Sequence, residues 1–476
     1  MLITLGIEDF GVYSIVGGVV AMLGFFTSAM STATQRFFSF ALGQSDAEKL
    51  KRIFTVNLVI YGTIAVLALI LLETLGLWFV TEKLKVPVGR FDSVIFIYHF
   101  SVLTFIATIF TTPFMSIIIA HEDMKVFAYI SIIEALMKLG MLFLLVKLPW
   151  DKLELYGVLI CGVAGIVAII YVVFCIIQYK ECQFKEFNFD RKLANEIVGF
   201  TGWSLLGQVS TVMRNQAVTI LLNQTFNPMV VAARAITMNV TSQINVFSNN
   251  FNVGLSPPII KLYASGDKKG MFLLLFRGSK ATFFLMWVFA LPLFLEMDPI
   301  LHLWLKTLPQ EAILFTRLAL VEVLIISISL PIMTAARAPG RMKVYELSLG
   351  LIQVAIFFVS WLVLVIGGAA FSVFIVAIVA NLIMFIVRLV VVRTLLDFPL
   401  YPFFLKVILP ICLVILISSI PAIAVHLILP KGKFFIGVSV LASLIFASLS
   451  MYFFGIDKLE RQKAKILILS QINRMF

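Results

Sequence analysis

Long runs of apolar residues alternate with short polar connections along almost the whole chain. Thirteen runs are long enough to cross a bilayer as helices, because about 20 apolar residues span its hydrocarbon core. They lie at 11–30, 54–80, 94–120, 126–148, 155–178, 198–223, 228–255, 280–297, 313–336, 344–366, 370–393, 403–428 and 434–454. Helices satisfy their own backbone groups in lipid. The pattern therefore predicts an all-α integral membrane protein, a polytopic bundle of about 13 transmembrane helices.

Part of the pattern occurs twice. Pro113 opens a phrase that continues through Met115 to the residues Met-Lys-Val-Phe at 124–127, and Pro331 opens the same phrase again 218 positions later, ending in Met-Lys-Val-Tyr. The turn at 44–46 returns more faintly at 265–267. A duplicated membrane unit commonly places its substrate site where the two copies meet.

The repeat predicts two pseudo-symmetric lobes around a central cavity. We expect an N-lobe at 1–180, a C-lobe at 181–393, and two additional C-terminal helices with a cytoplasmic tail at 394–476. Pro113 and Pro331 interrupt their apolar runs and should bend the helices there. They are candidate hinges for lobe movement, and an inherited packing kink is the alternative.

Composition supports a membrane protein and charge gives its orientation. Hydrophobic residues make up 61% of the chain, charged residues 13%, and the mean hydropathy is +1.07. The net charge of +12 does not indicate nucleic-acid binding, because most of the 37 Lys and Arg lie in alternate connections and in the tail. This asymmetry places those loops and the C-terminus in the cytoplasm, beside anionic membrane lipids. The four cysteines have no metal-ligand spacing, so neither a metal site nor a disulfide is expected.

Polar residues at helical spacing predict a lined cavity. A stripe of this kind facing lipid would be costly, so it must face another helix or water. The expected substrate-cavity residues are Arg214, Arg234, Asn215, Gln208, Thr241, Asn245, Ser248, Asn252, Ser28, Ser31 and Gln35. The alternative is hydrogen bonding within a buried seam between helices.

Two arginines near mid-span make the predicted interior positive. A guanidinium presents a planar fork of donors that suits phosphate or carboxylate oxygens. Alternatively, Glu322 or Glu134 neutralises Arg214 and Arg234. Glu134 and Lys138 are four residues apart and should pair on one helix face. Glu322 needs a partner elsewhere and is the better candidate for ion coupling, ahead of Glu134 and Lys138.

The order of several short motifs carries a family resemblance. The segment 5–13 reads Leu-Gly-Ile-Glu-Asp-Phe-Gly-Val-Tyr, and a small-residue helix ending at Arg36 follows it. With Gly202-Trp203-Ser204, Arg214-Asn215-Gln216 and the stretch 250–257, this order resembles bacterial polysaccharide exporters and O-antigen flippases over nearly the whole chain. Their superfamily also contains the multidrug and toxin extrusion antiporters. The resemblance implies fourteen helices in the family, the first of which is missing here.

The resemblance also implies a substrate, a place and partners. The substrate would be an undecaprenyl-diphosphate-linked oligosaccharide, flipped by alternating access across the bacterial inner membrane for surface polysaccharide or lipopolysaccharide biosynthesis. A polysaccharide polymerase would be a partner. We expect a monomer without cofactors or nucleic acid.

Other functions explain the sequence less well. No two aspartates stand close enough in the sequence for a metal-binding Asp-x-Asp, and there is no phosphate-binding loop, so an enzyme is not expected. A multidrug cation antiporter of the same fold is the first alternative, but the mid-span charge leans basic. A non-transporting membrane scaffold for glycan assembly is the second, and it leaves the polar stripes unexplained.

Overall fold

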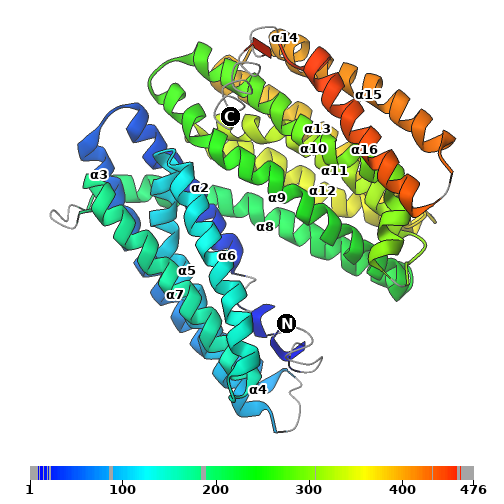
Figure 1. Cartoon of the computed structure of the whole chain (residues 1–476). Helices are drawn as coiled ribbons and strands as arrows, with labels where there is room; N and C mark the ends of the chain where they lie inside the picture. Colours follow the sequence, from blue (N-terminus) through cyan, green and yellow to red (C-terminus); the bar gives the residue numbers. More distant parts are fainter. Residues whose placement is uncertain are drawn as a thin grey trace, which may run out of the picture. The chain divides into compact units, whose positions relative to one another are not determined.

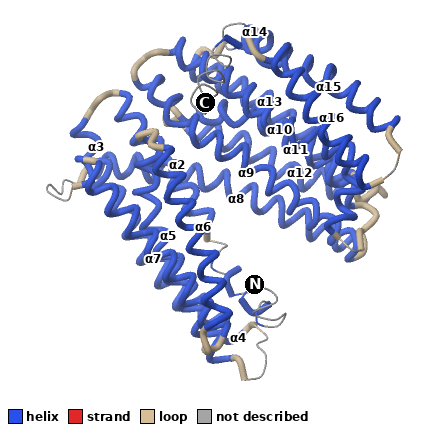
Figure 2. Tube along the Cα trace, viewed as in Figure 1, coloured by secondary structure: helices blue, strands red, loops and turns tan. Residues whose placement is uncertain are grey.

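The computed structural model describes residues 9, 11–13, 16–18, 20, 23–84, 89–183, 189–305, 307–430, 432–457 and 461–462. Helices joined by short connections make up this part of the chain, and it contains no strand (Figure 2). The α-helices are α2 (Gly24–Gly43), α3 (Ala47–Leu71), α4 (Leu77–Glu82), α5 (Phe91–Ala120), α6 (Met124–Lys147), α7 (Lys152–Gln178), α8 (Arg191–Thr225), α9 (Pro228–Ala264), α10 (Lys268–Trp304), α11 (Ala312–Arg337), α12 (Met342–Val365), α13 (Ser372–Leu396), α14 (Leu400–Phe403), α15 (Leu409–Ile428) and α16 (Lys433–Ser450).

Short π-helical segments continue some of these helices. Leu72–Gly76 joins α3 to α4, Phe404–Ile408 joins α14 to α15, and Met451–Gly455 extends α16. With these joins, the predicted spans from 54–80 onward each match one helix, and none extends more than two residues beyond its helix. Ten helices of the described chain are long and apolar enough to cross a membrane. Helices α2, α8 and α9 are not among the ten, and each of them carries part of the predicted polar stripes.

The predicted end of the first span is wrong. Residues 11–13, 16–18 and 20 are helical, but α2 continues to Gly43 and not to 30. The polar stretch that suggested an end is satisfied inside the protein. Ser31 hydrogen-bonds Ser116 at 3.0 Å, and Thr34 donates to Asn57 at 2.9 Å.

The chain forms two compact units. The first comprises Met1–Gln208 and Ile260–Gly266. Within it, α5 packs against α7, α2 and α3 (Figure 1), and the fully buried side chains of Tyr98 and Ile117 belong to its core. In the same unit, the Tyr98 hydroxyl donates to the Leu72 carbonyl at the π-helical segment.

The second unit comprises Val209–Ile259 and Asp267–Phe476. Helix α11 lies between α10 and α13, and α16 packs against α10 and α15. Two buried polar contacts attach the C-terminal helices to α10. Lys280 Nζ donates to the Gly455 carbonyl at 3.1 Å, and Trp287 Nε1 donates to Ser418 Oγ at 3.0 Å.

Helices α8 and α9 both pass from one unit to the other. Helix α8 belongs to the first unit up to Gln208, and the last residues of α9, from Ile260, return to that unit. The lobe boundaries predicted from the repeat describe duplication in the sequence and stay a prediction.

The repeat extends to local backbone geometry. In each copy the proline lies inside one helix, α5 or α11. The second methionine of the phrase, Met124 or Met342, is the first residue of the next helix, α6 or α12. The turns between these helices place Glu122 (φ 67°) and Gly340 (φ 80°), 218 positions apart, in the left-handed region. Ser45 (φ 56°) and Gly266 (φ 82°) do the same in the fainter repeat.

The fainter repeat also has matching helix caps. Asp46 accepts a hydrogen bond from the Lys49 amide at the start of α3, and Asp267 accepts one from the Gly270 amide at the start of α10. An aspartate at this position satisfies an amide that has no partner within its helix. The matching turns and caps support a structural duplication.

Candidate functional site

A buried ion pair in the second unit joins α8 to α11. Arg214 Nη1 donates to Glu322 Oε1 at 3.1 Å, and the two side chains are only 12% and 13% exposed. Asn381 Nδ2, from α13, donates to the same carboxylate oxygen at 2.9 Å. The pairing expected as the alternative for Arg214 is therefore present.

Arg234 lies in the same cluster without a carboxylate partner. It is 5% exposed, and its Nε donates to Thr219 Oγ1 at 3.0 Å. Its guanidinium carbon lies 5.6 Å from the centroid of the Phe374 ring. No carboxylate of the described residues lies within ion-pair distance of it. The predicted residue Asn215 links the two arginines, because its Oδ1 accepts from Arg214 at 3.0 Å and its carbonyl accepts from Arg234 at 3.5 Å.

The cluster holds two guanidinium groups and one carboxylate, which leaves one positive charge in excess. The Nε atom of Arg214 is buried without a hydrogen-bond partner. Charge in a low-dielectric environment is costly unless it is paired. An anionic oxygen entering this cluster would satisfy a free donor and cancel the excess charge.

Sequence reasoning did not identify Thr219, Phe374 or Asn381 as members of this cluster. Asn381 offered one signal, since it is an amide in the middle of an otherwise apolar span, where such a group needs a partner. Thr219 and Phe374 offered none, because a threonine and a phenylalanine are ordinary residues in membrane helices.

The predicted stripe on α9 is divided between two environments. Thr241 and Ser248 are buried and donate to carbonyls of their own helix, at Thr237 and Asn245. Asn245 and Asn252 are half-buried, and the Asn252 Oδ1 atom is buried without a partner. On α8, Gln208 is half-buried. A cavity-lining role for these residues stays a prediction.

The predicted stripe on α2 is part of a polar network in the first unit. Ser31 is buried, bonds Ser116 on α5, and accepts from Gln35 Nε2 at 2.9 Å. Ser28 is exposed, and Gln35 is half-buried. Ser28, Ser31 and Gln35 are uncharged, so these three side chains offer neutral donors and acceptors.

The remaining predicted residues are distributed over both units. Lys138 Nζ donates to Glu134 Oε1 at 2.6 Å on the exposed face of α6, which confirms their pairing. Pro113 and Pro331 are buried inside α5 and α11. A hinge role for the two prolines stays a prediction. The resemblance motif at 5–13 falls mostly outside the described residues.

Glu73 and Glu296 each contact a histidine of a neighbouring helix. Glu73, in the π-helical segment after α3, lies 3.0 Å from His99 Nδ1. Glu296, at a kink in α10 where φ is −102° and ψ is 23°, lies 2.6 Å from His426 Nδ1 on α15. These pairs attach the helix distortions to neighbouring helices.

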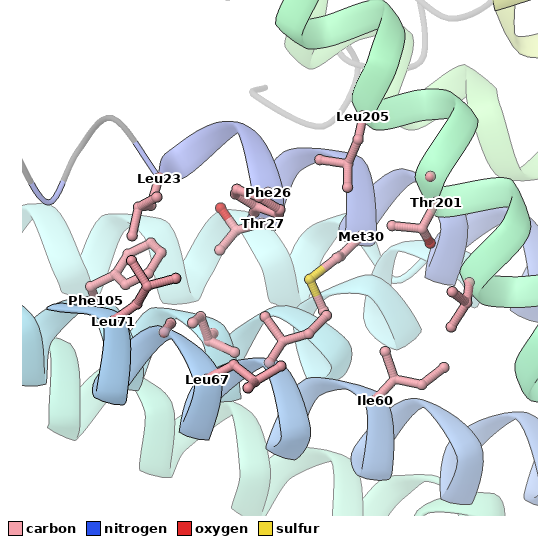
Figure 3. Close-up of a pocket in the computed structure, with 15 residues that line it drawn as sticks. Leu23, Phe26, Thr27, Met30, Ile60, Leu67, Leu71, Phe105, Thr201 and Leu205 are labelled. Atoms are coloured by element: carbon pink, nitrogen blue, oxygen red, sulfur yellow. The ribbon is translucent and has the colours of Figure 1, made fainter. Parts of the chain in front are cut away.

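An apolar cavity of about 340 Å³ lies in the first unit among α2, α3, α5 and the first half of α8 (Figure 3). Met30, Leu67 and Phe105 are among the side chains that line it. Its two threonines are satisfied by their own helices, because Thr27 donates to the Gly24 carbonyl and Thr201 to that of Ile197. The cavity therefore presents hydrocarbon and suits an apolar ligand.

Solved structures of membrane transporters share this fold. A mutant of the Vibrio cholerae MATE transporter VcmN matches with a TM-score of 0.66 and 16% identity, over 83% of this chain and 89% of that one. A MATE in complex with MaL6 matches with a TM-score of 0.72 and 11% identity, over 83% and 91%. An outward-facing multidrug resistance MATE family transporter of the MOP superfamily matches with a TM-score of 0.72 and 12% identity, over 83% and 89%.

No protein-family model and no curated protein sequence matches the chain. At identities this low the structural likeness shows the fold alone, so the protein is a multi-pass membrane protein with the MATE transporter fold. The fold expected from the superfamily is confirmed. Membership of the polysaccharide exporter and O-antigen flippase family stays a prediction.

Proposed function

We propose that the protein is a transporter that moves an anionic, lipid-linked oligosaccharide across the bacterial inner membrane by alternating access. The observation that carries the proposal is the excess positive charge of the Arg214, Arg234 and Glu322 cluster. A cation exporter needs an excess of acidic groups in its interior, whereas a diphosphate or an acidic sugar is attracted by paired guanidinium groups. The transporter fold supplies the second argument.

In the proposed cycle, the substrate anion binds at the arginine cluster while the lipid tail remains in hydrocarbon. Opening of the cluster first to the cytoplasmic and then to the periplasmic side would carry the glycan across. The lipid would be undecaprenyl diphosphate, the C-terminus would be cytoplasmic, and the product would serve a polysaccharide polymerase. These assignments follow from the family resemblance and from the charge asymmetry of the loops.

A gene deletion in the host tests the proposal. Loss of surface polysaccharide, with accumulation of lipid-linked oligosaccharide on the cytoplasmic leaflet, is the expected phenotype. Arg234→Lys should restore part of the activity because it keeps the charge but loses the planar fork, and Arg234→Glu should restore none. Lys268→Glu is the matched control and should restore all of it, since Lys268 is half exposed in a weak surface pair. Equal rescue by all three would contradict the assignment.

A multidrug antiporter is the second candidate function. The apolar cavity in the first unit favours it, because hydrocarbon walls suit lipophilic compounds. The solved neighbours include a multidrug resistance transporter. This candidate predicts that the deletion strain becomes sensitive to ethidium and keeps its surface glycan, which is the opposite of the phenotype expected above.

A further inference from the structure

Helix α9 has a second polar face that the predicted stripe does not include. Asn239, Gln243 and Asn250 are exposed and follow one another at spacings of four and seven residues. At 100° per residue they lie about 180° around the helix from the buried residues Thr241 and Ser248. No hydrogen bond of these three side chains to another described residue is found.

The two faces differ in burial. On the buried face, the hydroxyl groups of Thr241 and Ser248 donate to carbonyls one turn earlier in the same helix, and the amides of Asn245 and Asn252 on that face are half-buried. The exposed face carries amides, which have donors and acceptors available for an external partner. Hydrocarbon is an unsuitable partner for unpaired amides. Consistently, α9 is not among the helices apolar enough to cross a membrane.

The exposed face with Asn239, Gln243 and Asn250 also carries an aromatic ring. Phe247 is four residues after Gln243 and three before Asn250, and it is 49% exposed. Its ring stacks on that of Phe289, with the centroids 4.7 Å apart, so the ring is held in place. An exposed ring beside neutral donors and acceptors suits a sugar, whose ring has both apolar faces and hydroxyl groups.

We infer that this amide face, formed by Asn239, Gln243, Phe247 and Asn250, binds the sugar residues of the transported lipid. The inference rests on the proposed function and adds the part of the substrate that the arginines do not recognise. The face carries no charge, which matches the neutral hydroxyl groups of a glycan. From Asn239 to Asn250 the helix rises about 16 Å, the length of a short oligosaccharide.

Binding to the purified full chain in nanodiscs tests the inference with two probes. One is the lipid-linked oligosaccharide extracted from the deletion strain, and the other is undecaprenyl diphosphate without sugar. A triple variant, Asn239→Ala with Gln243→Ala and Asn250→Ala, should weaken binding of the first probe at least tenfold, since each lost hydrogen bond contributes about 0.5–1.5 kcal/mol. Its affinity for the second probe should change less than twofold.

The controls separate the possible failures. A double variant of exposed amides elsewhere, Gln178→Ala with Asn195→Ala, should bind both probes as the wild type does. Because the three substituted amides are exposed, the thermal midpoint of the triple variant should equal that of the wild type. If the triple variant weakens binding of both probes equally, or does not weaken binding of the lipid-linked oligosaccharide, the sugar assignment alone is overturned. Wild-type protein that binds neither probe would overturn the proposed function with it.

Discussion

Arg214 and Glu322 are 108 positions apart in the sequence, and their side chains meet at 3.1 Å inside the second unit. Removal of one partner from a buried ion pair costs about 3–5 kcal/mol, whereas replacement of both by apolar residues is often neutral. Glu322→Ala should therefore lower the thermal midpoint of the purified protein strongly. The double variant Arg214→Met with Glu322→Leu should recover most of that loss and remain inactive in the deletion strain. If the double variant is as unstable as Glu322→Ala, the instability of Glu322→Ala does not come from leaving the Arg214 charge buried and unpaired.

A close helix contact at Gly43 in the first unit predicts that one added methyl group there destabilises the protein. At Gly43, an added Cβ would lie 2.6 Å from the Lys261 carbonyl oxygen and 2.7 Å from its Cα. Backbone atoms cannot move aside easily, so Gly43→Ala should destabilise the protein by a few kcal/mol, on the order of the cost of overpacking. Gly62→Ala meets nothing within 4 Å and should stabilise α3 by about 0.5–1 kcal/mol. Thermal unfolding of both variants checks the contrast, and similar midpoints would argue against the contact.

The buried cluster of Thr34, Asn57 and Tyr61 predicts graded losses of stability. Asn57 Oδ1 accepts from Thr34, whose hydroxyl also lies 3.0 Å from that of Tyr61. Tyr61→Phe removes one partner and should cost about 1 kcal/mol, while Asn57→Ala leaves buried groups unpaired and should cost about 1–3 kcal/mol. Thr63→Val, at an exposed position of the same helix, should have little effect. Unfolding midpoints that do not follow this order would contradict the network.

Asp151 lies outside the membrane spans, and its carboxyl group predicts that the stability of the protein depends on pH. Burial raises the pKa of this carboxyl, but the stronger combined effect of the Arg90 hydrogen bond, the backbone amides and the Arg90 charge holds the pKa below its ordinary value of 3.8. A carboxyl with a lowered folded-state pKa stabilises the protein above that ordinary value, and the contribution is lost as the pH falls through the folded pKa. The stability difference between wild type and Asp151→Asn should thus be constant from pH 7 to 5 and shrink below about pH 4.

Asp151 also caps α7, because its Oδ1 accepts from the amides of Leu153 and Glu154. Asparagine preserves such a cap, and alanine does not, at a cost of about 1 kcal/mol. Asp151→Ala should therefore be less stable than Asp151→Asn at every pH. A pH-independent difference between wild type and Asp151→Asn would show that the charge of Asp151 makes no contribution.

Apolar runs predicted the helices well because burial in lipid requires long hydrophobic segments. The apolar runs did not predict the helix ends at which polar side chains continue the helix and form hydrogen bonds inside the protein. Helix α10 begins at Lys268 and not at 280, and it contains Lys280, which is buried because it donates to the Gly455 carbonyl. Partners 175 positions apart leave no local sequence signal.

The candidate site could be predicted only in part. Residue type and spacing identified the arginines and named Glu322 as one of two acids that could neutralise them. They could not tell that Glu322 would pair with Arg214 and leave Arg234 without a carboxylate. Periodicity also could not separate the two polar faces of α9. The kind of polar group offered a partial signal for Thr241 and Ser248, since hydroxyls can bond their own helix and remain buried.

Transbilayer movement in proteoliposomes tests the central claim most directly. The purified chain would be reconstituted with lipid-linked oligosaccharide from the deletion strain, and glycan of the inner leaflet would be detected as it becomes accessible to a membrane-impermeant reagent such as periodate. We predict that wild-type protein exposes the inner-leaflet glycan and that Arg234→Glu exposes no more than protein-free liposomes. Equal movement with wild type and Arg234→Glu, or no glycan movement by a wild-type protein that transports ethidium, would contradict the account.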